Sequence, residues 1–329
     1  MADEQRGFGW ANESEQEPTG QQPARAAVLA ERLGRLAERR VYLGTSSWKY
    51  PGWCGQIYDP ARYQYRGKFA QKQFERNCLA EYANVFPTVC GDFAFYQFPT
   101  AATWERTFEQ LPPGYKFSLK VPEEVTVERY PQLSRYGRRA GTSNGHFMDA
   151  DLVRDKLLNP LEAYRDKLGP LIFQFGTIHD GPMAEPANFS TALGEMLGEL
   201  PTNRFAFAVE VRNPPFVKHD GYFATLREHN TAHCLNSWTR MPPIGEQLAI
   251  NDVFTTDHVV ARLLLRPGRT YTQAVEKFAP YERVQDEYPE GRSALRELIE
   301  RCQSGGQALF AFVNNRFEGS AVETIESAI

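Results

Sequence analysis

Eight short apolar runs, most of them separated by amphipathic segments, constrain the fold of this chain more than any other feature. The runs have strand length, and the segments between them place apolar residues three or four apart, as helices do. The runs are Val41–Ser47, Val85–Phe93, Lys116–Pro122, Pro170–Gly176, Arg204–Arg212, Thr231–Trp238, His258–Leu264 and Gln307–Asn314. Strands that alternate with helices predict an α/β fold, and eight of them predict a single (β/α)8 TIM-type barrel with parallel strands. The main alternative is an open doubly wound sheet, but no Gly-x-Gly-x-x-Gly follows any run.

The chain divides into a tail, a helix and one large domain. Residues 1–23 are rich in Glu, Gln, Gly and Pro, which predicts a disordered tail. Residues 24–40 predict an N-terminal helix, and residues 41–329 predict the barrel domain. Two connections that follow strands, Trp48–Gly67 and Glu123–His146, are long enough to be active-site loops.

Composition limits the partners and the compartment. The net charge is -4 with both signs spread along the chain, so neither nucleic acid nor a membrane surface is an expected partner. No apolar run approaches the ~18 residues of a membrane span. The five cysteines are odd in number and form no Cys-x-x-Cys pair, which favours reduced thiols and a cytoplasmic protein.

The run RFAFAVEVR, residues 204–212, indicates where the chemistry lies. Successive strand side chains point to opposite faces, so Phe205, Phe207, Val209 and Val211 share one bulky face. The other face carries two alanines followed by Glu210 and Arg212. In a barrel, that face is narrow at the start of the strand and charged at its end, where the active sites of TIM-type barrels lie.

The same alternation places polar side chains at the ends of the other strands. We predict Glu210, Asp92 and Lys120 as catalytic residues. The predicted substrate-binding residues at strand ends are Arg212, Arg262, Gln174, Asn236, Asn314 and Asn315. Polar groups that face a barrel interior are costly unless paired or solvated, so their concentration at strand ends favours a site. The alternative is an ion-pair network that only plugs the mouth of the barrel.

The residue types at the strand ends favour an anionic ligand. Lys120, Arg212 and Arg262 outnumber Asp92 and Glu210, so the pocket should prefer a phosphate or carboxylate group. No histidine has metal-ligand spacing, and no cofactor or tightly held metal is predicted. Weak Mg²⁺ binding through the two carboxylates is left open.

Aromatic residues near two strand ends are further candidates. Trp48 and Tyr50 follow the first run, and Tyr96 follows the second. Such rings could stack on a sugar or a base, or they could form a hydrophobic plug under the loops.

Six motifs, in order, resemble those of the DUF72 (YecE-like) family. They are GTSSWKYPGW, DFAFYQFP, FSLKVPEEVT, LIFQFG, FAVEVRNP and FVNNRFEGSA. The resemblance implies a TIM-type barrel and a cytosolic protein, in a family without an established biochemical function. This chain departs from the family pattern at two positions, because Cys90 stands for the usual Glu and Asp92 for the usual Asn. The departure implies either that Asp92 takes over that role or that the chemistry differs.

Two functions follow as hypotheses. The first is an enzyme that acts on a small anionic molecule, phosphorylated or sugar-like, with Glu210 or Asp92 as base or acid. The second is a non-catalytic barrel that binds a metabolite or a protein.

Overall fold

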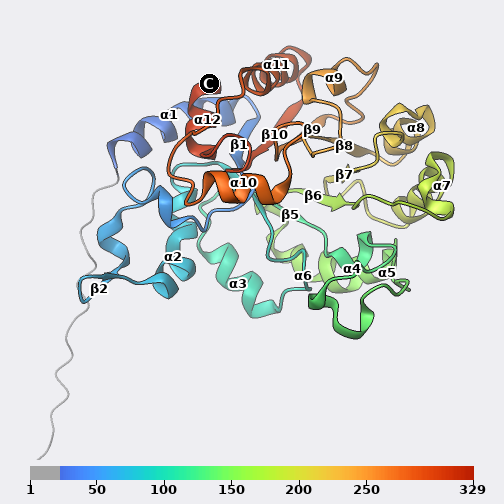
Figure 1. Ribbon diagram of the computed structural model, residues 1–329, viewed down its shortest axis with the longest axis horizontal. Helices are drawn as coiled ribbons and strands as arrows, with labels where there is room; N and C mark the ends of the chain where they lie inside the picture. The colour runs from blue at the N-terminus through green and yellow to red at the C-terminus, as the bar shows by residue number, and fades with distance from the viewer. Residues whose placement is uncertain (1–22) are drawn as a thin grey trace, which may run out of the picture.

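The eight predicted strands close into a barrel in the computed structural model, which describes residues 23–329 (Figure 1). The strands are β1 (Val41–Thr45), β4 (Thr88–Gly91), β5 (Lys116–Lys120), β6 (Leu168–Gln174), β7 (Phe207–Glu210), β8 (Thr231–Asn236), β9 (His258–Leu263) and β10 (Ala308–Val313). Every neighbouring pair is parallel, and β1 pairs with both β10 and β4, which closes the ring. The predicted (β/α)8 TIM-type barrel is therefore confirmed. The predicted disordered tail lies outside the described residues, except for Pro23.

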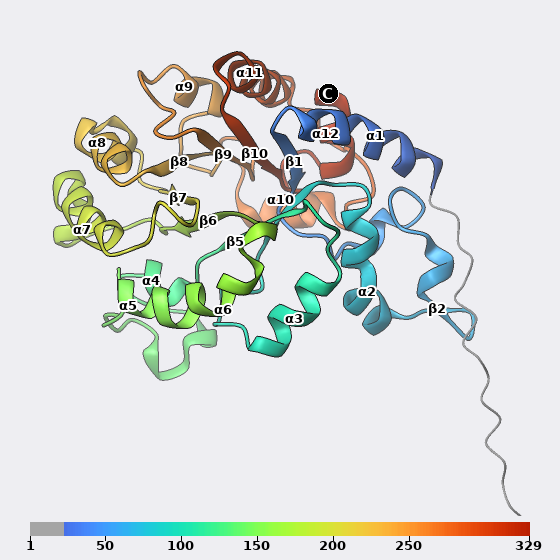
Figure 2. The ribbon, with the colours of Figure 1, turned by 180° about the vertical axis from the view of Figure 1, so that it is seen from behind.

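Helices surround the barrel on its outside (Figures 1 and 2). They are α1 (Ala24–Glu38), α2 (Gln71–Ala83), α3 (Ala101–Glu109), α4 (Glu123–Thr126), α5 (Ala150–Val153), α6 (Asn159–Leu161), α7 (Pro186–Gly198), α8 (Asp220–Glu228), α9 (Ile244–Leu248), α10 (Tyr271–Phe278), α11 (Pro289–Gly305) and α12 (Ala321–Ala328). Their ends follow from local chemistry. Thr100 accepts a hydrogen bond from the N–H of Thr103 to cap α3, and Gly306 ends α11 in the left-handed conformation that glycine adopts easily. A short hairpin of β2 (Gln64–Tyr65) and β3 (Lys68–Phe69) lies within the loop after β1.

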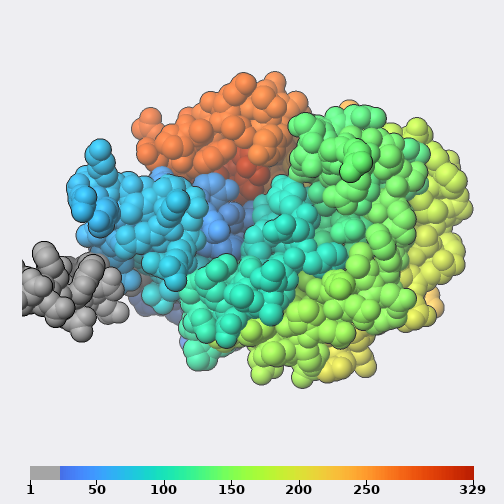
Figure 3. All heavy atoms as spheres, turned by 90° about the horizontal axis from the view of Figure 1, so that it is seen from below, coloured from blue at the N-terminus to red at the C-terminus, as the bar shows by residue number. Residues whose placement is uncertain are grey.

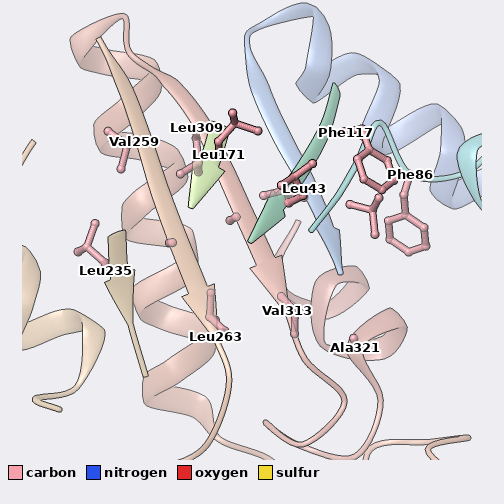
Figure 4. Close-up of a cluster of buried hydrophobic side chains, with 14 of the residues drawn as sticks. Leu43, Phe86, Phe117, Leu171, Leu235, Val259, Leu263, Leu309, Val313 and Ala321 are labelled. Atoms are coloured by element: carbon pink, nitrogen blue, oxygen red, sulfur yellow. The ribbon is translucent and has the colours of Figure 1, made fainter. Parts of the chain in front are cut away.

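The buried apolar side chains of the strands form two layers, one inside the barrel and one between the barrel and the helices. The outward-facing side chains of the strands, such as Leu43, Phe117 and Leu309, pack in the layer beneath the helices (Figure 4). The inward-facing side chains form a separate inner core, made of Tyr42, Cys90, Ile172, Ala208, Ala232, Cys234, Val260, Ala308, Phe310 and Phe312. The two layers follow from the strand sequence, because successive side chains along a strand point alternately into the barrel and out toward the helices. It leaves the strand ends for polar side chains.

Closure of the ring depends on Gly44 in β1. A Cβ atom at this position would lie 2.0 Å from the carbonyl oxygen of Thr88 in β4. Only glycine lets the two backbones approach this closely, so Gly44 permits the last pairing of the barrel.

His233 occupies the outer layer, where it packs against α8. Its Nδ1 lies 3.0 Å from the hydroxyl of Tyr222, its ring packs edge-on against Tyr222 and Phe223, and the residue is buried. Burial lowers the pKa of His233 to about 4, although Gln247 and Glu210 oppose the shift. The residue belongs to the packing rather than to the site at the strand ends.

Because the pKa of His233 is lowered, we expect the free energy of unfolding to fall in mild acid. An unfolded histidine takes up a proton near pH 6.5, but the folded protein keeps His233 neutral until about pH 4, so stability falls as the pH drops below 6.5. At pH 5 this contribution should reach about 2 kcal/mol. Urea unfolding of the parent and the His233→Leu variant at pH 7 and pH 5 measures it. The exposed His179→Leu variant is the control, and its free energy of unfolding should fall between pH 7 and pH 5 as much as that of the parent. An equal fall in the parent and in His233→Leu would contradict the lowered pKa of His233.

Candidate functional site

Five charged side chains and one glutamine, from the ends of five strands, meet at the C-terminal mouth of the barrel. Lys120, Gln174 and Glu210 end β5, β6 and β7, and Arg262 is the penultimate residue of β9. Asp92 directly follows β4, and Arg212 lies two residues beyond Glu210 on the same face. We call these six residues, Asp92, Lys120, Gln174, Glu210, Arg212 and Arg262, the mouth cluster.

Glu210 is the centre of the mouth cluster. It is 0% exposed, and its two oxygens accept hydrogen bonds from different arginines. Oε1 lies 3.0 Å from Nε of Arg212, and Oε2 accepts from Nη1 of Arg262. Burial alone would raise the pKa of Glu210, but Arg262, Arg212 and Lys120 outweigh it and lower the pKa below its ordinary value. The carboxylate is therefore charged at neutral pH and holds both guanidinium groups in place.

Gln174 adds a second link between the two arginines. Its Oε1 accepts from Nη2 of Arg212 at 3.0 Å and from Nη1 of Arg262 at 3.1 Å. Arg212 also lies over the ring of Trp238, with its guanidinium carbon 3.7 Å from the ring centroid. The side chain of Arg212 is 13% exposed and that of Arg262 only 3%. Of the two fixed arginines, Arg212 is thus the more accessible to a ligand.

Lys120 and Asp92 form the third ion pair of the mouth cluster. Lys120 Nζ lies 3.0 Å from Asp92 Oδ1 and 3.9 Å from the centroid of the Phe95 ring. Burial lowers the pKa of Lys120; Asp92 opposes this shift, and Arg262 adds to it. The ammonium group therefore gives up its proton more readily than a lysine in water. Asp92 is 40% exposed at its side chain and faces the open side of the pair.

The three predicted asparagines support backbone rather than the mouth cluster. Asn236 Nδ2 donates to the carbonyl oxygen of Val211 at 3.1 Å. Asn314 Oδ1 accepts from the N–H of Arg316 at 2.9 Å, and Asn315 Oδ1 accepts from that of Ala321 at 2.7 Å. Within residues 23–329 none of them hydrogen-bonds to a side chain of the mouth cluster. They lie at or just after strand ends, as the sequence predicts, but their hydrogen bonds hold backbone next to these strand ends.

The predicted aromatic residues do not gather at one place. The ring of Trp48 is buried in the outer layer, edge-on against Phe93 and Phe117. Trp48 is a hydrophobic plug there. Tyr50 packs against the rings of Trp53 and Tyr281. Tyr96 is 58% exposed beneath the guanidinium of Arg135.

Trp238 and a cleft beside it were not predicted as part of the site. Arg212 and Trp238 border a cavity of about 870 Å³ between loop residues 126–143 and 176–182. The sequence did contain a signal for Trp238. It lies two residues after Asn236 in the same predicted strand, so the alternation of side chains places both residues on one face. Part of the long loop Glu123–His146 forms one wall of the cavity, so this loop does border the site.

The described residues at the mouth include few ligands for a metal ion and no exposed thiol. Within the described part of the chain, no three His, Cys, Asp or Glu side chains are grouped to hold a metal ion. Both carboxylates of the mouth cluster already face cations, and weak Mg²⁺ binding stays a prediction. Cys90 lies in the inner core, where burial raises its thiol pKa to about 11 and disfavours the nucleophilic thiolate.

The fold and the site define a TIM-type barrel with a charged C-terminal mouth. The family model described as "Protein of unknown function DUF72" matches residues 42–328, so the chain belongs to the DUF72 family. A DUF72 family protein from Thermotoga maritima is similar in structure at 18% identity, with a TM-score of 0.56 over 87% of this chain and 98% of the other. One from Enterococcus faecalis is similar at 14% identity, with a TM-score of 0.57 over 88% and 94%.

These structural similarities, at such low identity, show the common fold. No curated protein matches the sequence. Among the described residues no helix is long and apolar enough to cross a membrane.

Removing Arg262 should destabilise the protein strongly. The Arg262→Leu change leaves the buried Glu210 carboxylate with one arginine fewer, and breaking such a pair typically lowers the free energy of unfolding by about 3–5 kcal/mol. Urea unfolding measures the loss. Arg35→Leu is the control, because it removes an exposed i,i+4 pair with Glu31 that contributes about 0.5 kcal/mol or less. A loss for Arg262→Leu no larger than for Arg35→Leu would contradict the role given to the pair.

Proposed function

We propose that this protein is an enzyme that binds a small anionic molecule, phosphorylated or sugar-like, at the C-terminal mouth of the barrel. The observation that carries the proposal is the charge of the mouth cluster. Three cations meet two carboxylates where Glu210, Lys120 and Arg262 are all nearly inaccessible to water. An excess of positive charge in such a place favours an anionic group, because charged hydrogen bonds strengthen as water is excluded.

Arg212 and Lys120 are the proposed contacts for the anionic group. Arg212 is the more exposed of the two fixed arginines, and Glu210 and Gln174 already hold its guanidinium, so binding costs it little conformational freedom. Arg262 and Glu210 act beneath it as positioning residues. The rest of the molecule would extend into the cavity beside Trp238, whose size is within the usual range for ligand pockets.

The Lys120–Asp92 pair is the proposed acid–base group. Burial lowers the pKa of Lys120, so it is the proposed proton donor to the bound molecule, and Asp92, 3.0 Å away and partly exposed, lies beside it. Glu210 is the less accessible base, because both of its oxygens face arginine N–H groups. Its proposed contribution is to hold the cations in a fixed geometry.

One observation favours the alternative of a binding protein without turnover. Every carboxylate of the mouth cluster faces a cation, so no free base is present in this arrangement. Native mass spectrometry of gently purified protein would identify a retained ligand, and incubation with that ligand would distinguish turnover from binding alone.

Phosphate binding tests the proposed contacts. In isothermal titration calorimetry, inorganic phosphate should bind more weakly to Arg212→Ala and to Lys120→Ala by about 1–3 kcal/mol, which is on the order of 5- to 150-fold in Kd. Arg165→Ala is the control, since it removes a surface arginine paired with Glu162, and it should bind like the parent. Unchanged phosphate affinity in the Arg212→Ala and Lys120→Ala proteins would remove the basis of the proposal.

Glu210→Gln tests whether the central carboxylate serves function. The change keeps the shape of the side chain and deletes the charge that fixes Arg212 and Arg262. Circular dichroism should show a folded protein. Turnover of the ligand that native mass spectrometry identifies should fall at least tenfold. Full turnover and affinity in a protein that melts far below the parent would assign Glu210 to stability alone.

A further inference from the structure

A second group of side chains lies at the mouth, beside Asp92. It consists of Arg316 and the three tyrosines Tyr50, Tyr271 and Tyr281, and we call it the Arg316 group. Arg316 follows β10, where its backbone N–H donates to Asn314 Oδ1 at 2.9 Å. Its guanidinium carbon lies 4.5 Å from the centroid of the Tyr271 ring, and the Tyr50 and Tyr281 rings pack edge-on at 5.6 Å.

Arg316 differs from the other arginines of the mouth in what its side chain contacts. Glu210 fixes Arg212 and Arg262, and Asp286 pairs with Arg266 and Arg269 in the loop after β9. Within residues 23–329 the guanidinium of Arg316 makes no ion pair and no hydrogen bond. Stacking on Tyr271 uses the face of the guanidinium and leaves the N–H groups at its edge for an anionic group.

Tyr50 of the Arg316 group lies near charged residues of both groups. Burial raises the pKa of Tyr50 to about 12, with Arg316 opposing the shift and Asp92 adding to it, so both charged groups lie close enough to act on this phenol. Tyr50 therefore keeps its proton and can donate a hydrogen bond. Asp92 in turn pairs with Lys120. The Arg316 group and the mouth cluster therefore lie near each other at this end of the barrel.

The surface of the protein is hollowed where these loops meet. Figure 3 shows a hollow between the loops that follow β1, β4, β5 and β9, in blue, teal, green and orange, with the red C-terminal part of the chain at its floor. The loop after β9 carries Tyr271 and Tyr281.

Tyr281 has a φ of 71°, which is rare for a bulky side chain, and such backbone strain is concentrated at ligand sites.

We infer that the Arg316 group is a second anion-binding subsite, which takes a second phosphate or carboxylate group of the same substrate. This inference rests on the proposed function, in which the mouth cluster holds the first anionic group. Arg316 supplies the charge, Tyr271 orients it, and the Tyr50 hydroxyl supplies a neutral donor. The substrate class is thereby narrowed to molecules with two anionic groups.

The number of phosphate ions bound by each variant tests the subsite. By calorimetric titration with inorganic phosphate, the parent should bind two ions. Arg316→Ala should weaken one of the two at least tenfold and leave the other unchanged, and Arg212→Ala should do the converse. Arg316→Lys keeps the charge and should recover part of the lost affinity. Arg301→Ala is the matched control, because Arg301 also stacks on an aromatic ring, that of Phe254 at 4.9 Å, and it should leave both ions bound.

The outcomes separate this inference from the proposed function. A single phosphate that is lost in Arg212→Ala and kept in Arg316→Ala would overturn the second subsite and leave the proposed function standing. A single phosphate that is lost only in Arg316→Ala would overturn the proposed role of the mouth cluster. Two ions that both persist in Arg316→Ala would also overturn the subsite.

Discussion

The arrangement of the barrel mouth depends on one buried carboxylate, Glu210. A charge with no access to water is tolerated only when it is paired and hydrogen-bonded, and Glu210 meets this condition through Arg212 and Arg262. The two arginines are cations that would otherwise repel each other at close range. Glu210 and Gln174 hold them together, so the mouth keeps positive charge in a fixed geometry rather than on mobile side chains.

The inner core explains why this charge lies at the mouth and not deeper. Below Glu210 most of the inward-facing residues are small or apolar, among them Ala208, Cys90 and Phe310. Above Glu210, strand ends and loops supply Arg212, Trp238 and Asp92, and the side chains begin to reach water. The charged layer is therefore confined to about one level of the barrel, where a ligand can enter and most water is excluded.

The sequence predicts this level well wherever the period of two applies. Glu210, Lys120, Gln174 and Arg262 lie within strands, so the apolar side chains on either side of them determine which way they point. Once the strand ends, that constraint is lost. Trp48 lies beyond β1 and turns into the outer layer, which no alternation in its loop predicts.

The asparagines and Arg316 show a second limit on what the sequence can predict, namely which partner a side chain contacts. Asn315 stands at a strand end as predicted, yet its side chain caps the backbone of the following helix, because an unpaired N–H there is a closer partner than a ligand. Arg316 gives no strand signal, and its position beside Tyr271 and Tyr50 depends on loops from distant parts of the chain. Residues that meet only through tertiary packing of loops carry no local pattern from which the contact could be predicted.

The most direct test of the central claim is an anomalous difference map from crystals of the protein soaked in selenate, a tetrahedral anion with a strong anomalous scatterer. We predict a peak at the barrel mouth, with selenate oxygens within hydrogen-bonding distance of Arg212 and Lys120. Glu210 should still be bound to both arginines beneath it. A mouth without a peak, in crystals that bind selenate elsewhere, would contradict the claim that the buried Glu210 arranges these cations for an anionic ligand.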